Sequence, residues 1–115
     1  MARGDIIYVD LPQPAGPTGH EQIGIRPVLV VHDDATSGVL SVIVIIPFTA
    51  TLTAQRYPHT ILVQPSPQNG LTAPSVLLVF QLRAIDRTRF TNTIGHLEPN
   101  IMQLVEDELR RMLGL

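Results

Sequence analysis

Apolar residues along this chain fall into short runs separated by clusters of glycine, proline and polar residues. Residues 24–31 predict a strand, because Val28 to Val31 are consecutive apolar residues, mostly β-branched, typical of burial on both faces. A second continuous run, over residues 41–49, predicts another central strand, and Pro47 marks where it leaves the sheet or reaches an edge. Shorter runs predict further strands over residues 4–10, 59–63, 75–86 and 93–97. The strand over residues 75–86 is predicted to be long or bent.

The periodicity changes at the C-terminal end of the chain. Apolar residues there recur at helical spacing and predict one apolar helix face, formed by Ile101, Met102, Val105, Leu109, Met112 and Leu113. Pro99 suits the first turn of such a helix, and Gly114 suits the position just after its last turn.

The predicted elements define a fold class. The chain has 115 residues, which predicts one domain over residues 1–115. No helical pattern separates the strands, which argues against parallel βαβ units. A small, strongly bent antiparallel barrel of five or six strands, with the C-terminal helix packed against it, would close such a sheet.

Composition and charge exclude several classes of protein. The chain has no cysteine, so it contains neither a disulfide framework nor a thiolate metal site. Its longest apolar segment, residues 39–48, is shorter than the ~18–20 residues that span a bilayer, and the N-terminus is not a signal peptide, so we expect a cytoplasmic protein. The net charge is −2 and does not indicate a broad nucleic-acid surface; the local exception is the cluster Arg83, Arg87 and Arg89.

Arg26 is the first candidate for chemistry. It stands at the mouth of the strand over residues 24–31, between Gly24 and Pro27. Because arginine keeps its charge, we expect either a carboxylate partner or an anionic ligand there. The preceding loop, residues 11–24, carries His20 and Glu21 and has the length of a functional or mobile segment. The other histidines, His32, His59 and His96, show no metal-ligand spacing.

The order and spacing of several short motifs resemble the MazF/PemK family of toxin endoribonucleases over nearly the whole chain. These motifs are Arg3-Gly4-Asp5-Ile6, Glu21-Gln22, Arg26-Pro27-Val28-Leu29-Val30-Val31, Pro47-Phe48-Thr49, Gly70-Leu71, Ser75-Val76, Gln81-Leu82-Arg83 and Ile94-Gly95-His96-Leu97. The resemblance implies a mainly β (α+β) fold, a small SH3-like antiparallel barrel of five to seven strands with a C-terminal helix, which the gyrase-poisoning CcdB toxins share.

The resemblance also implies a function, that of a type II toxin that cleaves single-stranded RNA selectively without a metal or other cofactor. A ribose 2′-hydroxyl would attack the adjacent phosphorus and leave a cyclic phosphate. Arg26 and Thr49 carry over as the catalytic pair, with Gln81 as an orienting amide. Glu21, His20, Arg83 and Arg87 are the further candidates for substrate binding. The implied partners are RNA, a cognate antitoxin and a second copy of the chain, with no membrane.

Two alternatives stay open at this point. One is a CcdB-like toxin that binds gyrase, although that family relies on a C-terminal tryptophan and this chain has none. The other is a catalytically inactive relative that only binds a partner. It stays open because Ile25 and Phe80 stand where the family usually has a basic and an acidic residue.

Overall fold

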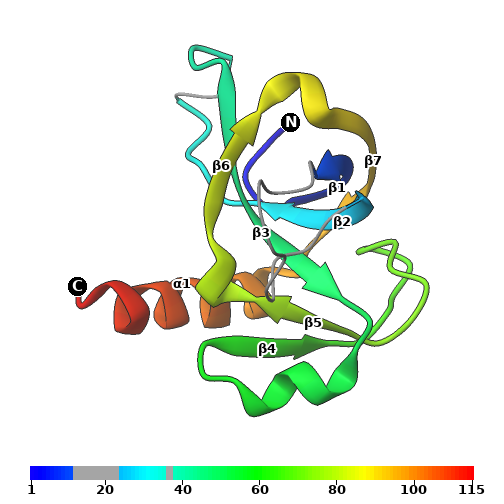
Figure 1. Ribbon diagram of the computed structural model, residues 1–115, viewed down its shortest axis with the longest axis vertical. Helices are drawn as coiled ribbons and strands as arrows, with labels where there is room; N and C mark the ends of the chain where they lie inside the picture. The colour runs from blue at the N-terminus through cyan, green and yellow to red at the C-terminus, as the bar shows by residue number, and fades with distance from the viewer. Residues whose placement is uncertain (12–23, 36–37) are drawn as a thin grey trace, which may run out of the picture.

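A seven-stranded antiparallel sheet and one helix make up the computed structural model, which describes residues 1–11, 24–35 and 38–115 (Figure 1). The sheet order is β4-β5-β3-β2-β1-β7, and β6 also pairs with β3. The elements are β1 (Asp5–Leu11), β2 (Gly24–Val30), β3 (Val42–Thr49), the 3₁₀ helix η1 (Leu52–Arg56), β4 (Thr60–Val63), β5 (Ser75–Leu78), η2 (Val79–Gln81), β6 (Arg83–Asp86), η3 (Arg87–Arg89), β7 (Phe90–His96) and α1 (Pro99–Leu113).

Strand β3 connects the two halves of the sheet. Its first part pairs with β6 and β2, and Pro47 lies opposite Val28 as the last residue that pairs with β2. The next two residues, Phe48 and Thr49, pair instead with β5. Proline has no N–H to continue a ladder on both sides, so it suits the point at which a strand changes partners. The predicted departure or edge at this proline is, in the structure, a change of partner strand within the same sheet.

The predicted antiparallel, mainly β fold with a C-terminal helix is confirmed, but the predicted closure into a barrel is wrong. Within the described residues β4 and β7 are the ends of the sheet, and they pair only with β5 and β1. Helix α1 supplies the physical reason, because it covers the open side. Val105 of α1 shares one buried cluster with Ile6 of β1, Val63 of β4 and Leu77 of β5. The helix therefore buries the apolar surface that closure would otherwise cover.

A second buried cluster lies on the other face of β1 and β2. It consists of aliphatic residues from the first three strands and from β6, namely Ile7, Val9, Leu11, Val28, Val30, Ile43, Ile45 and Ile85. Neighbouring residues of a strand point to opposite faces, so Val28 and Val30 enter this cluster while Leu29 enters the other. Burial on both faces explains the uninterrupted apolar run of β2, as predicted.

The segment predicted as one long or bent strand, residues 75–86, is divided in the structure. It becomes β5, η2 and β6, because the chain turns at η2 to reach the opposite side of β3. The last strand starts at Phe90, earlier than predicted, because exposed polar residues there still pair with β1. Helix α1 has the predicted extent, and Gly114 caps it at φ 73°. In the part of the chain that is described, no helix has the length and apolar character needed to cross a membrane.

The turn before β5 is locked against β7. Asn69 is fully buried, and its Oδ1 accepts hydrogen bonds of 3.0 Å from the backbone N–H groups of Ser66 and Leu71. Its Nδ2 donates to the carbonyl of Gln64 at 2.9 Å. Gly70 follows at φ +72°, in the left-handed region that favours glycine. The turn thereby fixes the start of residues 71–75, a segment that lines the functional site.

Candidate active site

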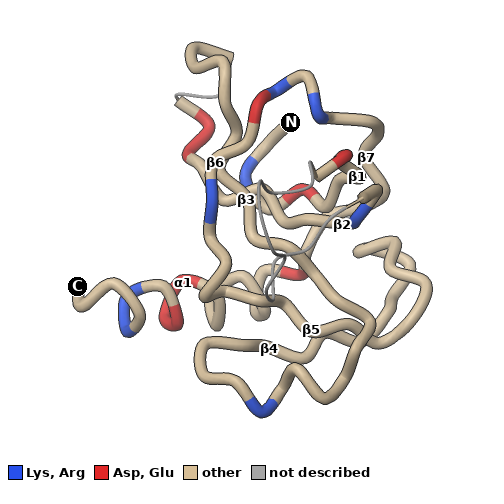
Figure 2. The backbone as a smooth tube through the Cα atoms, viewed as in Figure 1, with Lys and Arg blue, Asp and Glu red and all other residues tan. Residues whose placement is uncertain are grey.

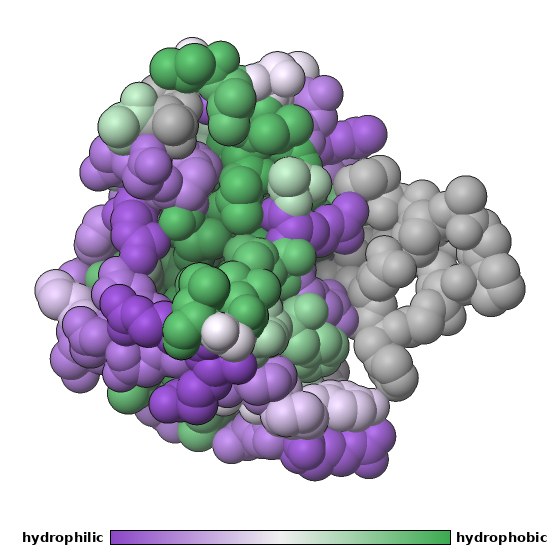
Figure 3. Space-filling model, turned by 90° about the vertical axis from the view of Figure 1, so that its left-hand side faces the viewer, coloured by the Kyte–Doolittle hydropathy of each residue, from purple (hydrophilic) through white to green (hydrophobic). Residues whose placement is uncertain are grey.

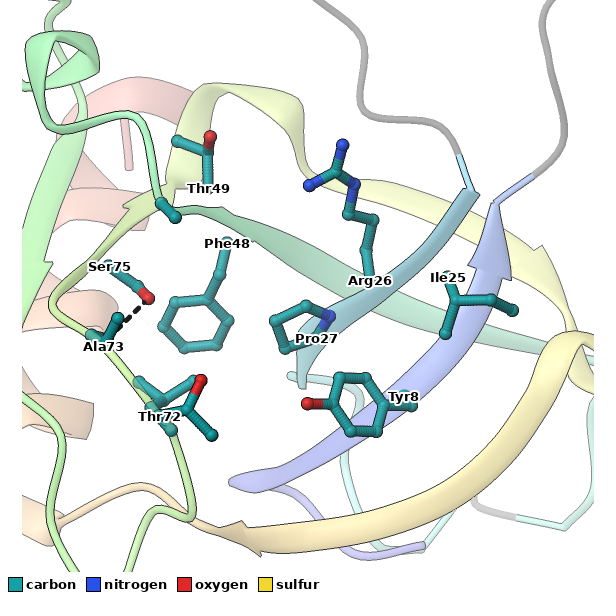
Figure 4. Close-up of a pocket in the computed structure, with 11 residues that line it drawn as sticks. Tyr8, Ile25, Arg26, Pro27, Phe48, Thr49, Thr72, Ala73 and Ser75 are labelled. Carbon is teal, nitrogen blue, oxygen red and sulfur yellow. Dashed lines mark hydrogen bonds between the residues drawn. The ribbon is translucent and has the colours of Figure 1, made fainter.

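A pocket of about 240 Å³ opens where β2, the end of β3 and residues 71–75 meet (Figure 4). Its lining combines one charged side chain, several hydroxyl groups and an apolar floor, from Tyr8, Ile25, Arg26, Pro27, Phe48, Thr49, Ala50, Leu71, Thr72, Ala73 and Ser75. The two residues predicted as the catalytic pair, Arg26 and Thr49, both line this pocket although they lie on different strands.

Arg26 lies in the exposed first half of β2, opposite Val9 of β1. The apolar second half of the same strand is completely buried, so the core fixes the backbone that carries the guanidinium. Figure 4 shows this side chain leaning toward the side of the pocket on which Thr49 lies. Among the described residues that line the pocket, Arg26 is the only charged one at neutral pH. The pocket therefore favours an anion.

Thr49 is the last residue of β3 and is only 7% exposed. Its Oγ1 accepts a hydrogen bond of 3.2 Å from the backbone N–H of Thr51. Because this bond uses a lone pair of the oxygen, the hydroxyl hydrogen is left to donate into the pocket. Phe48, 1% exposed, anchors the strand directly before it. A guanidinium and a hydroxyl donor beside one cavity can together bind the oxygens of a phosphate group.

The other predicted substrate residues lie elsewhere. Gln81 belongs to η2, Arg83 to β6 and Arg87 to η3, and none of them lines the pocket. Arg87 donates from Nε and Nη2 to the carbonyl of Leu40, both at 3.2 Å, which ties η3 to the β2–β3 connection. Residues 20 and 21, His20 and Glu21, lie outside the described residues. A substrate role for these five residues stays a prediction.

Three polar residues of the pocket were given no role in the site from the sequence: Tyr8, Thr72 and Ser75, the last of which appears only within the family motif Ser75-Val76. Tyr8 lies opposite Pro27 in the β1–β2 ladder, so the strand register could have placed it beside Arg26. Nothing in the local pattern indicates that residues 72 and 75 reach the same cavity. Of the two departures from the family pattern, Ile25 lies at the pocket and is 61% exposed, whereas the ring of Phe80 packs 5.8 Å from that of Tyr57.

A second pocket, of about 300 Å³, lies beside the start of α1. Its charged residues are already paired with their neighbours: Arg3 binds Glu106 and donates to the carbonyl of Val31 at 2.9 Å, and His96 lies 3.0 Å from Asp5. These pairs join the N-terminus, β7 and α1, and we assign them to the scaffold. In the described parts of the chain no group of three histidine, aspartate or glutamate side chains could hold a metal ion.

Comparison with known proteins agrees with this fold. The family model described as "PemK-like, MazF-like toxin of type II toxin-antitoxin system" matches residues 2–113. The endoribonuclease EndoA of Bacillus subtilis is 32% identical over 115 residues, which cover all of this chain and 96% of that protein. The crystal structure of MazF from Deinococcus radiodurans superposes with a TM-score of 0.78 at 26% identity, covering 100% of this chain and 97% of the other.

A mycobacterial endoribonuclease solved in complex with its cognate antitoxin has the same fold. Its TM-score is 0.76 at 22% identity, and the match covers 100% of this chain and 96% of that one. Taken together, the matching family model and these relatives, with the open antiparallel sheet and its C-terminal helix, define a toxin of the MazF type. The chain belongs to the PemK-like, MazF-like toxin family of type II toxin–antitoxin systems.

Proposed function

We propose that this protein is the toxin of a type II toxin–antitoxin system and cleaves single-stranded RNA at selected sequences. The observation that carries the proposal is the shared pocket of Arg26 and Thr49, in a chain whose relative EndoA is named an endoribonuclease. Single-stranded RNA suits a narrow pocket, because its bases can leave the stack and be bound individually. The eight arginines are also spread over the molecule (Figure 2), which fits local phosphate binding better than a broad basic face.

The chemistry is a transesterification that divides the RNA into an upstream fragment ending in a cyclic phosphate and a downstream fragment beginning with a 5′-hydroxyl. The ribose 2′-oxygen forms a bond to phosphorus while the bond from phosphorus to the 5′-oxygen breaks, leaving a cyclic phosphate and a 5′-hydroxyl. The 2′-hydroxyl loses a proton and the leaving oxygen gains one, so protons balance. Arg26 stabilises the negative charge that develops on the non-bridging oxygens and assists proton transfer, and the Thr49 hydroxyl donates to one of these oxygens.

The partners follow from the same proposal. The relatives solved as toxin–antitoxin complexes support a cognate antitoxin for this chain, in the cytoplasm where messenger RNA is exposed. An acidic, extended antitoxin segment would compete with RNA for the positive pocket. We also propose a homodimer. Figure 3 shows an apolar band between the β2–β3 connection and the end of α1, where Val39, Leu40, Leu113 and Leu115 are exposed.

The test is cleavage of mixed RNA by the purified protein in excess chelator, with the fragment ends identified. We expect fragments with 5′-hydroxyl and cyclic phosphate ends. Intact RNA from a protein with a native circular dichroism spectrum would instead favour the inactive, partner-binding alternative. Inhibition of DNA gyrase without RNA cleavage would favour the CcdB-like one.

Arg26→Ala gives the sharper test of the site. Because Arg26 is exposed at the open end of β2, the variant keeps its fold. It should lose roughly 100-fold or more in cleavage rate, as expected for removal of a donor to a developing oxyanion. Arg110→Ala, an exposed arginine on α1 far from the pocket in sequence and fold, is the matched control and should cleave normally. Equal rates for the two variants would show that the site is misplaced.

A further inference from the structure

The pocket has a second side that the proposed chemistry does not use. Arg26 and Thr49 are sufficient to hold a phosphate, whereas the cavity of about 240 Å³ also extends over Tyr8, Pro27 and Phe48. This volume is slightly smaller than the roughly 300–1,000 Å³ of sites that hold whole small-molecule ligands. It therefore suits one flat ring beside the phosphate, in the part of the pocket lined by aromatic and apolar groups.

Tyr8 provides the side wall of that space. It is half-buried on β1, with Pro27 opposite it in the ladder. Figure 4 shows its ring beside Pro27 and its hydroxyl turned toward Thr72, across the pocket. A tyrosine with part of its ring covered usually finds a partner for its hydroxyl, yet this hydroxyl has none among the described residues. Both the ring and the hydroxyl are available to a ligand.

The floor and the far edge of the space are also defined. Phe48, 1% exposed, closes the floor. Ser75, 7% exposed, donates its hydroxyl hydrogen to the carbonyl of Ala73 at 3.0 Å, so it offers the pocket a lone pair and acts as an acceptor. Thr72 is exposed at the same edge, and its hydroxyl can donate or accept. An acceptor held in place by a backbone carbonyl selects a ligand edge that carries an N–H group.

We infer that Tyr8 packs against the nucleobase next to the cleaved phosphate, and that Ser75 accepts a hydrogen bond from an N–H group on that base. This inference rests on the proposed ribonuclease function and goes beyond it, since it assigns part of the sequence selectivity to residues outside the arginine–threonine pair. The ligand class is an unpaired RNA base that stacks on an aromatic side chain and is read along its edge.

Intrinsic fluorescence tests the contact directly, because the chain has two tyrosines and no tryptophan. In Tyr57→Phe, Tyr8 is the only tyrosine left, and Tyr57 lies away from the pocket lining. The probe is an RNA oligonucleotide with the cut site that the wild-type protein selects, made uncleavable by a 2′-deoxy nucleotide at the attacking position. We expect the probe to quench the Tyr57→Phe variant and to leave the Tyr8→Phe variant, which reports only Tyr57, unchanged. Equal responses from the two variants at saturation would overturn the inference.

Cleavage kinetics separate this inference from the proposed function. Tyr8→Ala should lower kcat/KM by about 5- to 150-fold on the selected RNA, the range found for loss of one stacked base. Tyr8→Phe should stay within a few-fold of wild type, and Tyr8→Leu, which keeps bulk in the β1–β2 ladder, should resemble Tyr8→Ala. On a substrate with an abasic nucleotide at the contacted position, the four proteins should cleave at similar rates.

The outcomes are distinct. If the wild-type protein does not cleave RNA, the proposed function fails and the inference falls with it. If the wild-type protein cleaves RNA but Tyr8→Ala and Tyr8→Leu cleave intact RNA as fast as the wild type, or lose the same factor relative to the wild type on intact and abasic substrates, the function stands and the role of Tyr8 is wrong. Ser75→Ala completes the set. It should relax the preference for the base at that position more than it slows cleavage of the best substrate.

Discussion

Gly70 shows how one missing side chain decides the shape of the pocket wall. A Cβ built on Gly70 would lie 2.0 Å from the carbonyl oxygen of Ile94, and one on Gly95 would lie 2.3 Å from the backbone of Asn69. The backbones of the turn and of β7 therefore approach each other more closely than any side chain allows. The approach is fixed further by a 2.9 Å hydrogen bond from the N–H of His96 to the carbonyl of Gln68.

Gly70→Ala should destabilise the protein by about 2–5 kcal/mol, because it adds backbone overlap to left-handed strain. Gly114→Ala is the matched control. Gly114 has nearly the same backbone angle, φ +73°, but nothing lies within 4 Å of its added Cβ. Gly114→Ala should therefore be destabilised only by the left-handed backbone strain, about 1–2 kcal/mol. Chemical unfolding of both variants measures the difference, and equal losses would show that the close approach at Ile94 is not a constraint.

The residues of the site were only partly predictable. Arg26 stands out locally, as a charge at the mouth of a strand, but Thr49 has no local signal and was found only through the family motif. Tyr8 enters the pocket through its register opposite Pro27, whereas Thr72 and Ser75 enter it because the turn at Asn69 directs residues 71–75 back toward β2. Hydrogen bonds of that kind join residues whose pairing the sequence pattern does not show.

At the level of elements, α1 is joined to the β4 end of the sheet by a charged contact. Nδ1 of His59 lies 2.6 Å from Oε1 of Glu108, and Nη2 of Arg111 lies 2.6 Å from Oε2 of the same carboxylate. These contacts, first Arg111 and then His59, hold the pKa of Glu108 below its ordinary value. His59 itself adopts φ 60°, an uncommon conformation for a residue with a side chain, which the contact helps to maintain.

This contact predicts a pH dependence. Because the pKa of Glu108 is lower in the folded state, its contribution to stability is fully present above about pH 4.5, the ordinary value for glutamate, and disappears as the pH falls through the folded value. At pH 7 Glu108→Gln should therefore be less stable than wild type by about 0.5–1 kcal/mol. The difference should vanish near pH 2–3.

Unfolding in urea across this pH range measures the effect. Adding Arg111→Gln to Glu108→Gln should cost little more, because the arginine has already lost its charged partner. A stability difference that stays constant from pH 7 to pH 2 would contradict this account.

The elements themselves were largely predictable. The buried strands β2 and β3 and the helix α1 follow from apolar runs and helical spacing that local sequence displays. The break between β5 and β6 and the early start of β7 were not, because the partner strand decides both. The open sheet could not be foreseen either, since it depends on α1 packing between sheet ends that lie far apart in the sequence.

At the scale of the whole molecule, the exposed apolar band predicts self-association. The protein should sediment at twice its chain mass of 12.6 kDa. A double variant with Val39→Arg and Leu113→Arg should sediment as a monomer, because both side chains are more than half exposed and would bring charge into the interface. Phe90→Arg, an exposed apolar residue at the start of β7, is the control and should remain dimeric. A wild-type monomer at micromolar concentration would exclude the dimer.

The change of partners at Pro47 has a consequence for how the site works. Arg26 lies on β2, which pairs with β1. Thr49 follows Pro47 by two residues, at the end of β3, where the strand pairs with β5 and through it with β4. The distance between the Arg26 guanidinium and the Thr49 hydroxyl therefore depends on the angle between these two pairs of strands, which meet at Pro47. A ligand that binds between the two pairs of strands and rotates one pair relative to the other would change the distance between Arg26 and Thr49 without contacting either side chain.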